Sequence, residues 1–185
     1  MSGVLHSTAD ASAWVMRWAH LIPQQGNVLD LACGHGRHMA WLGQQGFACL
    51  GVDRDPIALQ SAKSHGQVMQ ADLENQAWPL ADRHFQGVVV TNYLWRALWP
   101  DLLNSLAVGG VLIYETFARG NETVGKPSNP AFLLQPGELL SLCKGLHVIA
   151  YEDGFAAQPD RFVQRIVAVH EPSPVSTPHR YSLRH

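Results

Sequence analysis

The sequence is poor in charged residues and contains no long hydrophobic run. Charged residues make up 15% of the 185 residues, and 13 Lys and Arg stand against 15 Asp and Glu, a net charge of −2. Phosphate contacts need clustered basic side chains, so this balance argues against nucleic acid as a partner. No apolar run approaches the roughly 20 residues of a membrane-spanning helix, so we expect no membrane association.

Cysteine is also scarce. The three cysteines form neither an even set nor a Cys-x-x-Cys pair, which argues against a disulfide framework. The first residues are too polar for a secretory signal, so we expect the protein in the cytoplasm. The ten histidines include no His-Glu-x-x-His motif and no Cys/His pair, so no metal site is expected.

The chain does have a regular alternation of β-rich and helical stretches. Hydrophobic residues make up 46% of it and the mean hydropathy is −0.05, as in packed globular proteins. Strands are predicted at 27–33, 48–53, 67–73, 87–93, 110–117, 147–153 and 162–170, and helices at about 10–22, 37–45, 55–65, 100–106 and 136–144. This alternation predicts an α/β, Rossmann-like fold with a doubly wound, mostly parallel seven-stranded sheet.

The end of the pattern predicts an antiparallel last strand. The segment 154–161 joins the last two expected strands and is too short for the crossover that parallel strands need. We expect residues 1–170 to form a single domain and 171–185, with three prolines, to form an irregular tail. The segment 118–134 lacks clear periodicity, and we expect it to be a lid that opens easily.

A glycine-rich turn after the first expected strand carries the main functional signal. The stretch 28–53 reads VLDLACGHGRHMAWLGQQGFACLGVD, with Gly34 and Gly36 in the turn and Asp53 at the end of the second strand. The glycines let a ligand approach the backbone, and the Asp53 carboxylate can accept both hydroxyls of a ribose. A methionine replaces the third glycine of a dinucleotide fingerprint. Asp30 would repel a pyrophosphate but suits the cationic groups of S-adenosylmethionine.

This stretch resembles the first motif of the class I S-adenosylmethionine-dependent methyltransferases, with Ala32 in place of the motif's first glycine. The resemblance extends in order over about 14–170. It is nearest in appearance to small bacterial enzymes grouped with tellurite-resistance and thiopurine methyltransferases. It implies S-adenosylmethionine as cofactor, Asp53 as the ribose ligand and Arg54 as a flank of the adenine.

Two later segments extend the resemblance. The segment 70–80 is similar to the adenine motif, which implies that the Asp72 carboxylate and the Leu73 backbone N–H contact the adenine. Asp72 could also merely cap a turn. The segment 85–94 is similar to the fourth motif, which implies that Asn92 borders the transferred methyl group.

The residues around the acceptor are less defined. Tyr93, Arg96 and His38 are the candidate catalytic residues at the pocket mouth, and each could also be an ordinary structural residue. The segment 92–100 has aromatic side chains and one cation, which could hold a flat or anionic acceptor or pack the following helix.

The predicted activity is methyl transfer to a small-molecule acceptor by a monomer or homodimer. A non-catalytic cofactor-binding subunit and a nicotinamide oxidoreductase are the alternatives.

Overall fold

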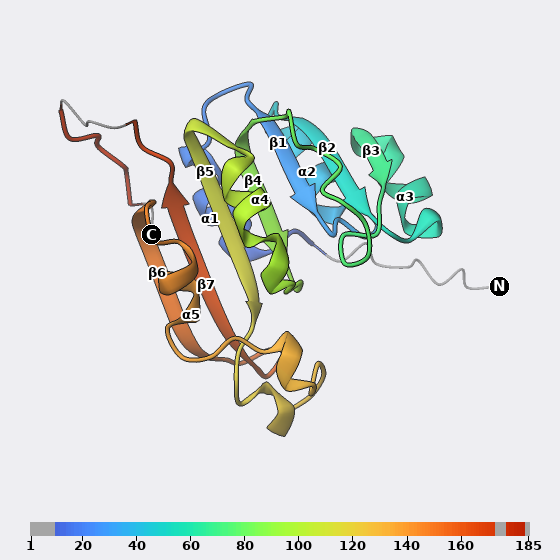
Figure 1. Ribbon diagram of the computed structural model, residues 1–185, viewed down its shortest axis with the longest axis vertical. Helices are drawn as coiled ribbons and strands as arrows, with labels where there is room; N and C mark the ends of the chain where they lie inside the picture. The colour runs from blue at the N-terminus through green and yellow to red at the C-terminus, as the bar shows by residue number, and fades with distance from the viewer. Residues whose placement is uncertain (1–9, 173–176, 184–185) are drawn as a thin grey trace.

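The structure, a computed structural model, describes residues 10–172 and 177–183. At its centre is a seven-stranded sheet in the order β3-β2-β1-β4-β5-β7-β6 (Figure 1). The strands are β1 (Asn27–Leu31), β2 (Ala48–Asp53), β3 (Gln67–Gln70), β4 (Phe85–Thr91), β5 (Leu106–Phe117), β6 (His147–Ala156) and β7 (Arg161–Val169). Pairs from β3 to β5 are parallel, whereas β7 is antiparallel to β5 and β6. The predicted sheet, including its antiparallel last strand, is confirmed.

Helices cover both faces of this sheet. They are α1 (Ala13–Trp18), α2 (Arg37–Gln44) and α3 (Pro56–Ala62) on one face, and α4 (Trp99–Asn104) and α5 (Glu138–Leu142) on the other. Figure 1 shows α4 and α5 in front of the sheet and α1 behind it. Successive strand residues point to opposite faces, so Val28 enters one core and Leu29 the other. This is why the central strands are apolar throughout.

Short 3-10 helices lie between these elements: η1 (Ala19–Leu21), η2 (Lys63–His65), η3 (Arg96–Leu98), η4 (Asn121–Thr123) and η5 (Pro130–Phe132). The helix predicted at 55–65 begins at an N-cap, because the Asp55 side chain accepts a hydrogen bond from the Ile57 backbone N–H at 2.8 Å. The expected helix at 10–22 is shorter than predicted: Ser12 caps α1, and η1 follows it.

Some strand boundaries differ from the prediction for local reasons. β1 ends at Leu31 because Ala32 adopts a left-handed conformation with φ 54°. β3 ends at Gln70, ahead of a turn closed by hydrogen bonds to Asp72. β5 begins at Leu106, so the predicted helix 100–106 ends earlier than expected.

The segment before α1 is held against the sheet by polar contacts. The Ser12 hydroxyl donates to the buried Glu115 carboxylate at 3.0 Å, and Arg165 pairs with the same carboxylate at 2.5 Å. The Arg37 guanidinium donates to the Asp10 carbonyl at 3.2 Å. The chain therefore reaches α1 by passing the start of α2 and contacting the carboxyl-end half of β5.

The described part of the tail, residues 171–172 and 177–183, contains no helix or strand and packs on the body. The Tyr181 hydroxyl donates to Glu171 at 2.9 Å, and the Ser182 carbonyl lies 2.9 Å from a ring nitrogen of His20. Within the described ranges, no helix has both the length and the apolarity to cross a bilayer.

Candidate active site

The glycine-rich turn after β1 has an unusual backbone that explains its sequence. Ala32, Gly34 and Gly36 all have positive φ, at 54°, 54° and 79°. A Cβ at Gly36 would lie 2.8 Å from the backbone of Ala62, so glycine lets α2 and α3 approach each other. A Cβ at Gly34 would meet no atom within 4 Å. Gly34 therefore borders open space at the end of β1, where a ligand can approach the backbone.

Asp53 closes this turn from the neighbouring strand. Its Oδ2 accepts from the Gly34 backbone N–H at 2.8 Å, and its Oδ1 accepts from the Asp55 N–H at 2.9 Å. Each carboxylate oxygen has a second lone pair, so both can still accept a hydroxyl. The Gly34 N–H is therefore engaged internally, by Asp53.

Asp30 is a buried carboxyl group beneath the turn. Its side chain is 1% exposed and its Oδ2 has no hydrogen-bond partner within the described residues. Burial raises its pKa from 3.8 to about 7; the charge of Arg37 opposes this rise, the charge of Asp53 adds to it, and the Met39 N–H lowers it. An orphaned carboxyl oxygen of this kind suits a cationic or N–H-donating ligand group.

His38 does not lie at a pocket mouth, and that prediction is wrong. Its side chain is 2% exposed, and its Nδ1 lies 3.8 Å from the nearer Asp30 oxygen. Burial, together with the charge of Arg37, lowers its pKa from 6.5 to about 3. His38 is therefore a neutral imidazole packed beside Asp30.

The predicted adenine residues follow β3. Asp72 accepts from the Glu74 backbone N–H at 3.1 Å and from the Asn75 side chain at 2.8 Å, and these bonds lower its pKa. Asp72 thus does cap a turn, and its capping partners leave lone pairs for a further donor. Leu73 is buried and Arg54 is exposed at the end of β2.

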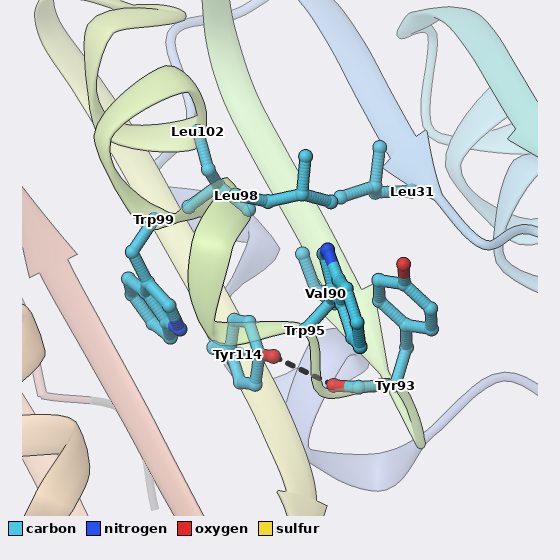
Figure 2. Close-up of a pocket in the computed structure, with 8 residues that line it drawn as sticks. All are labelled: Leu31, Val90, Tyr93, Trp95, Leu98, Trp99, Leu102 and Tyr114. Carbon is cyan, nitrogen blue, oxygen red and sulfur yellow. Dashed lines mark hydrogen bonds between the residues drawn. The ribbon is translucent and has the colours of Figure 1, made fainter. Parts of the chain in front are cut away.

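Asn92 and Tyr93 extend from the end of β4. Asn92 has φ 54°, a conformation that asparagine tolerates better than most residues. The Tyr114 hydroxyl on β5 donates to the Tyr93 carbonyl at 2.6 Å (Figure 2). This bond holds the end of β4 against β5.

The aromatic residues beyond β4 serve mainly as packing. The small apolar site in Figure 2 has a volume of about 10 Å³, room for a single water molecule. Trp99 is buried and its ring lies 4.9 Å from that of Tyr114. Trp99 therefore packs α4 against the sheet and does not hold an acceptor, which decides between the two alternatives for this residue.

A larger pocket lies at the carboxyl ends of β4 and β5. It has a volume of about 210 Å³, and we call it the edge pocket. Its lining residues come from four segments: Glu74, Asn92, Tyr93, Leu94, Thr116, Phe117, Pro127 and Phe132. The segment 118–134 thus supplies one wall of this pocket.

Arg96 does not face the edge pocket, contrary to prediction. Its guanidinium makes two hydrogen bonds with the Glu138 carboxylate, at 2.6 and 2.9 Å. It also donates to the Ala131 and Leu133 carbonyls at 2.6 and 2.9 Å. Its charge and its donors are used to tie the segment 118–134 and α5 to the end of β4.

The segment 118–134 is also better anchored than its composition predicts. Leu133 and Leu134 are buried in the core, and Ala118 bridges to Leu134 in parallel pairing. The buried Asn121 side chain bonds to Pro127 and to the Phe162 backbone. The two ends of the segment are thus anchored, whereas residues 122–132 are exposed apart from the half-buried Pro127.

Sequence reasoning missed several residues of the edge pocket. Glu74 and Thr116 follow or end strands at the carboxyl edge, a position that could have marked them. Phe132 belongs to an aperiodic connection with no local signal. Across 10–172 and 177–183, no group of three or more His, Cys, Asp or Glu side chains is placed to hold a metal ion.

Comparison with known proteins agrees with this architecture. Residues 28–108 match the family model described as Methyltransferase domain, and no curated protein matches the sequence. TehB from Haemophilus influenzae is similar in structure, with 19% identity and a TM-score of 0.70 over 90% of this chain. This chain spans 64% of that one.

Two further solved structures are similar. A TehB-like S-adenosylmethionine-dependent methyltransferase from Corynebacterium glutamicum has 21% identity and a TM-score of 0.61, over 88% of this chain and 89% of that chain. The glycopeptide N-methyltransferase MtfA, solved with S-adenosylhomocysteine, has 19% identity and a TM-score of 0.62, over 88% and 90%.

The glycine-rich turn, the strand order and the family match together define the class. The family match covers residues 28–108, and the sheet has the strand order and the antiparallel last strand of the class I S-adenosylmethionine-dependent methyltransferase fold. The structural neighbours of the chain include TehB and a TehB-like methyltransferase, and S-adenosylmethionine is the cofactor of the class. The open space at Gly34 and the unpartnered Asp30 oxygen fit this cofactor.

Proposed function

We propose that this protein transfers a methyl group from S-adenosylmethionine to a small-molecule acceptor bound in the edge pocket. The observation that carries the proposal is a pocket of about 210 Å³ that begins at Asn92 and Tyr93, directly after β4, the strand that pairs with β1 and its glycine-rich turn. That volume lies below the roughly 300–1,000 Å³ of sites for drug-sized ligands. A compact acceptor therefore suits it.

The cofactor residues have distinct roles in this proposal. Asp53 accepts the ribose hydroxyls with the lone pairs that Gly34 and Asp55 leave unused. Asp30 offers its unpartnered oxygen to the cationic amino acid end. The backbone at Gly34 borders open space where the cofactor can approach it, and Ala32 and Gly36 complete the left-handed backbone of the turn.

The remaining cofactor contacts come from the neighbouring strand ends. Asp72 and the Leu73 N–H hold the adenine, Arg54 flanks it, and Asn92 borders the methyl group. When bound, the cofactor supplies an electrophilic methyl group on a sulfonium.

The protein's own contribution to the reaction is positioning. Proximity and orientation supply about 7–11 kcal/mol of barrier lowering in well-aligned systems. Burial raises the pKa of the Tyr93 hydroxyl, so it stays protonated at neutral pH and can orient an acceptor but not deprotonate it. His38 is buried beside Asp30, away from the pocket lining.

The structure offers reasons against the two alternatives. A cofactor-binding subunit without catalysis has no need of a pocket beside the methyl position. A nicotinamide dinucleotide would bring a pyrophosphate toward the buried Asp30 carboxyl, which repels an anion once ionised. We also propose that the partner of this protein is the small-molecule acceptor and that the protein is a monomer or a homodimer.

The test is cofactor binding by the Asp53→Ala variant. Loss of a charge-assisted, two-point contact should weaken S-adenosylmethionine binding by about 1.5–3 kcal/mol in calorimetry. Asp82→Ala removes an exposed carboxylate in the loop before β4 and should bind like the wild type. Unchanged affinity in Asp53→Ala would refute the ribose assignment. Tighter binding of NAD than of S-adenosylmethionine would refute the function.

A further inference from the structure

The walls of the edge pocket are aromatic or apolar. Tyr93, Phe117 and Phe132 contribute rings, and Leu94 and Pro127 contribute aliphatic surface. Phe132 is 40% exposed, an unusual position for a large apolar side chain. Such walls favour a ligand with a flat or apolar body, which would cover part of this exposed ring.

The charge in the pocket has one sign. Of the eight lining residues only Glu74 is charged, and it is acidic. Arg96, the cation predicted at the pocket mouth, is bound to the Glu138 carboxylate at 2.6 Å and does not line the pocket. An anion entering the pocket would therefore meet a carboxylate and no basic lining side chain.

The charges around the Tyr93 side chain are also mainly negative. Its hydroxyl is buried and has no hydrogen-bond partner within the described residues. After burial, the charges of Glu74 and Asp72 raise its pKa, Arg54 opposes them, and Asp53 adds a smaller rise. Three carboxylates against one guanidinium make the potential at this hydroxyl negative.

We infer that the edge pocket takes a small aromatic or apolar molecule carrying a basic nitrogen, with that nitrogen bound to the Glu74 carboxylate. The inference rests on the proposed function, because it names the acceptor class of that site. A protonated or N–H-bearing nitrogen donates to Glu74, and the Tyr93 hydroxyl oxygen is a second acceptor within the same lining. Oxyanions such as tellurite lack the apolar body, and the Glu74 carboxylate repels their negative charge.

The experiment uses three probes, of which two share a phenylethyl body and carry opposite charges. 2-Phenylethylamine, 3-phenylpropionate and tellurite are each titrated by calorimetry into the full chain with S-adenosylhomocysteine present. The amine should bind roughly tenfold more tightly than the carboxylate, the effect of one partly exposed charge-assisted contact. Tellurite should show no binding.

Variants locate the effect. Glu74→Gln should remove the preference for the amine, whereas Asp82→Asn, which changes an exposed carboxylate outside the pocket, should retain it. Phe132→Ala should weaken both phenyl probes by a similar factor and leave their ratio unchanged, because it removes ring contact but no charge.

The outcomes separate this inference from the proposed function. If S-adenosylhomocysteine itself does not bind, the proposed function fails. If it binds, the inference is overturned by equal or tighter binding of the carboxylate or tellurite, by no binding of either phenyl probe, or by a preference that survives in Glu74→Gln.

Discussion

Replacing Asp30 by asparagine should stabilise the fold at neutral and alkaline pH. The side chain is buried and its Oδ2 is unpartnered, so the ionised form is costly in the folded chain. Its pKa is raised from 3.8 to about 7, first by burial. A tenfold change in proton affinity corresponds to about 1.4 kcal/mol, so the full effect is at most about 4 kcal/mol.

The sign of the pH dependence follows from proton binding. Between pH 4 and pH 7 the folded chain keeps the Asp30 proton while the unfolded chain releases it. Stability is therefore greatest below about pH 4, is lost as pH rises through about 7, and is constant with respect to this group above that. The variant lacks this dependence. The stability difference between variant and wild type should grow over this range and then level off.

Urea denaturation at a series of pH values measures this difference. The difference measured near pH 4 is subtracted, because it contains any constant cost of burying the new amide. The remaining difference in free energy of unfolding should increase by about 2–4 kcal/mol by pH 8. Asp82→Asn serves as the control, because its exposed side chain is solvated in both states. A difference that stays flat from pH 4 to pH 8 would refute the assignment of Asp30 as a buried group titrating near neutrality.

Two further changes test other parts of the site. Gly36→Ala should destabilise the fold by more than about 1 kcal/mol in urea denaturation, because its Cβ would lie 2.8 Å from the Ala62 backbone at a φ of 79°. In Gly34→Ala the new Cβ enters open space, so this variant should lose less stability than Gly36→Ala but more cofactor affinity. If Gly36→Ala loses more cofactor affinity than Gly34→Ala, the space at Gly34 is not the cofactor site. Arg96→Met should lower turnover and raise the KM for the acceptor while cofactor affinity changes less than about twofold, because Arg96 holds the segment 118–134 and not the cofactor. If cofactor affinity falls by the same factor as turnover, Arg96 instead supports the cofactor site as well as the edge pocket.

The cofactor edge was predictable because its signals are local. The order strand, glycine-rich turn, helix and second strand lies within 28–53, and backbone preferences there depend on neighbours in sequence. Asp53 meets Gly34 because parallel strands bring their carboxyl ends to one edge. The antiparallel last strand followed from a short connection. The assignment of cofactor contacts to these residues stays a prediction.

The acceptor side was decided by the tertiary structure. Arg96 was read as a free cation, yet its partner Glu138 is 42 residues away in sequence and no local pattern links the two. His38 was placed at a surface, yet the packing of α2 against the sheet buries it beside Asp30. The segment 118–134 was expected to open easily because it is long and lacks periodicity, yet Arg96 and the burial of Leu133 and Leu134 anchor its end.

Sequence alone thus determined the order of the elements, the glycine-rich turn and the class of cofactor, since each depends on residues close together in the chain. Only the tertiary structure decided which charges are paired and which remain in the edge pocket. Glu74 and Phe132 line one pocket although they come from distant segments. Burial and ion pairing depend on contacts between such segments, and these contacts exist only once the sheet and its helices have packed.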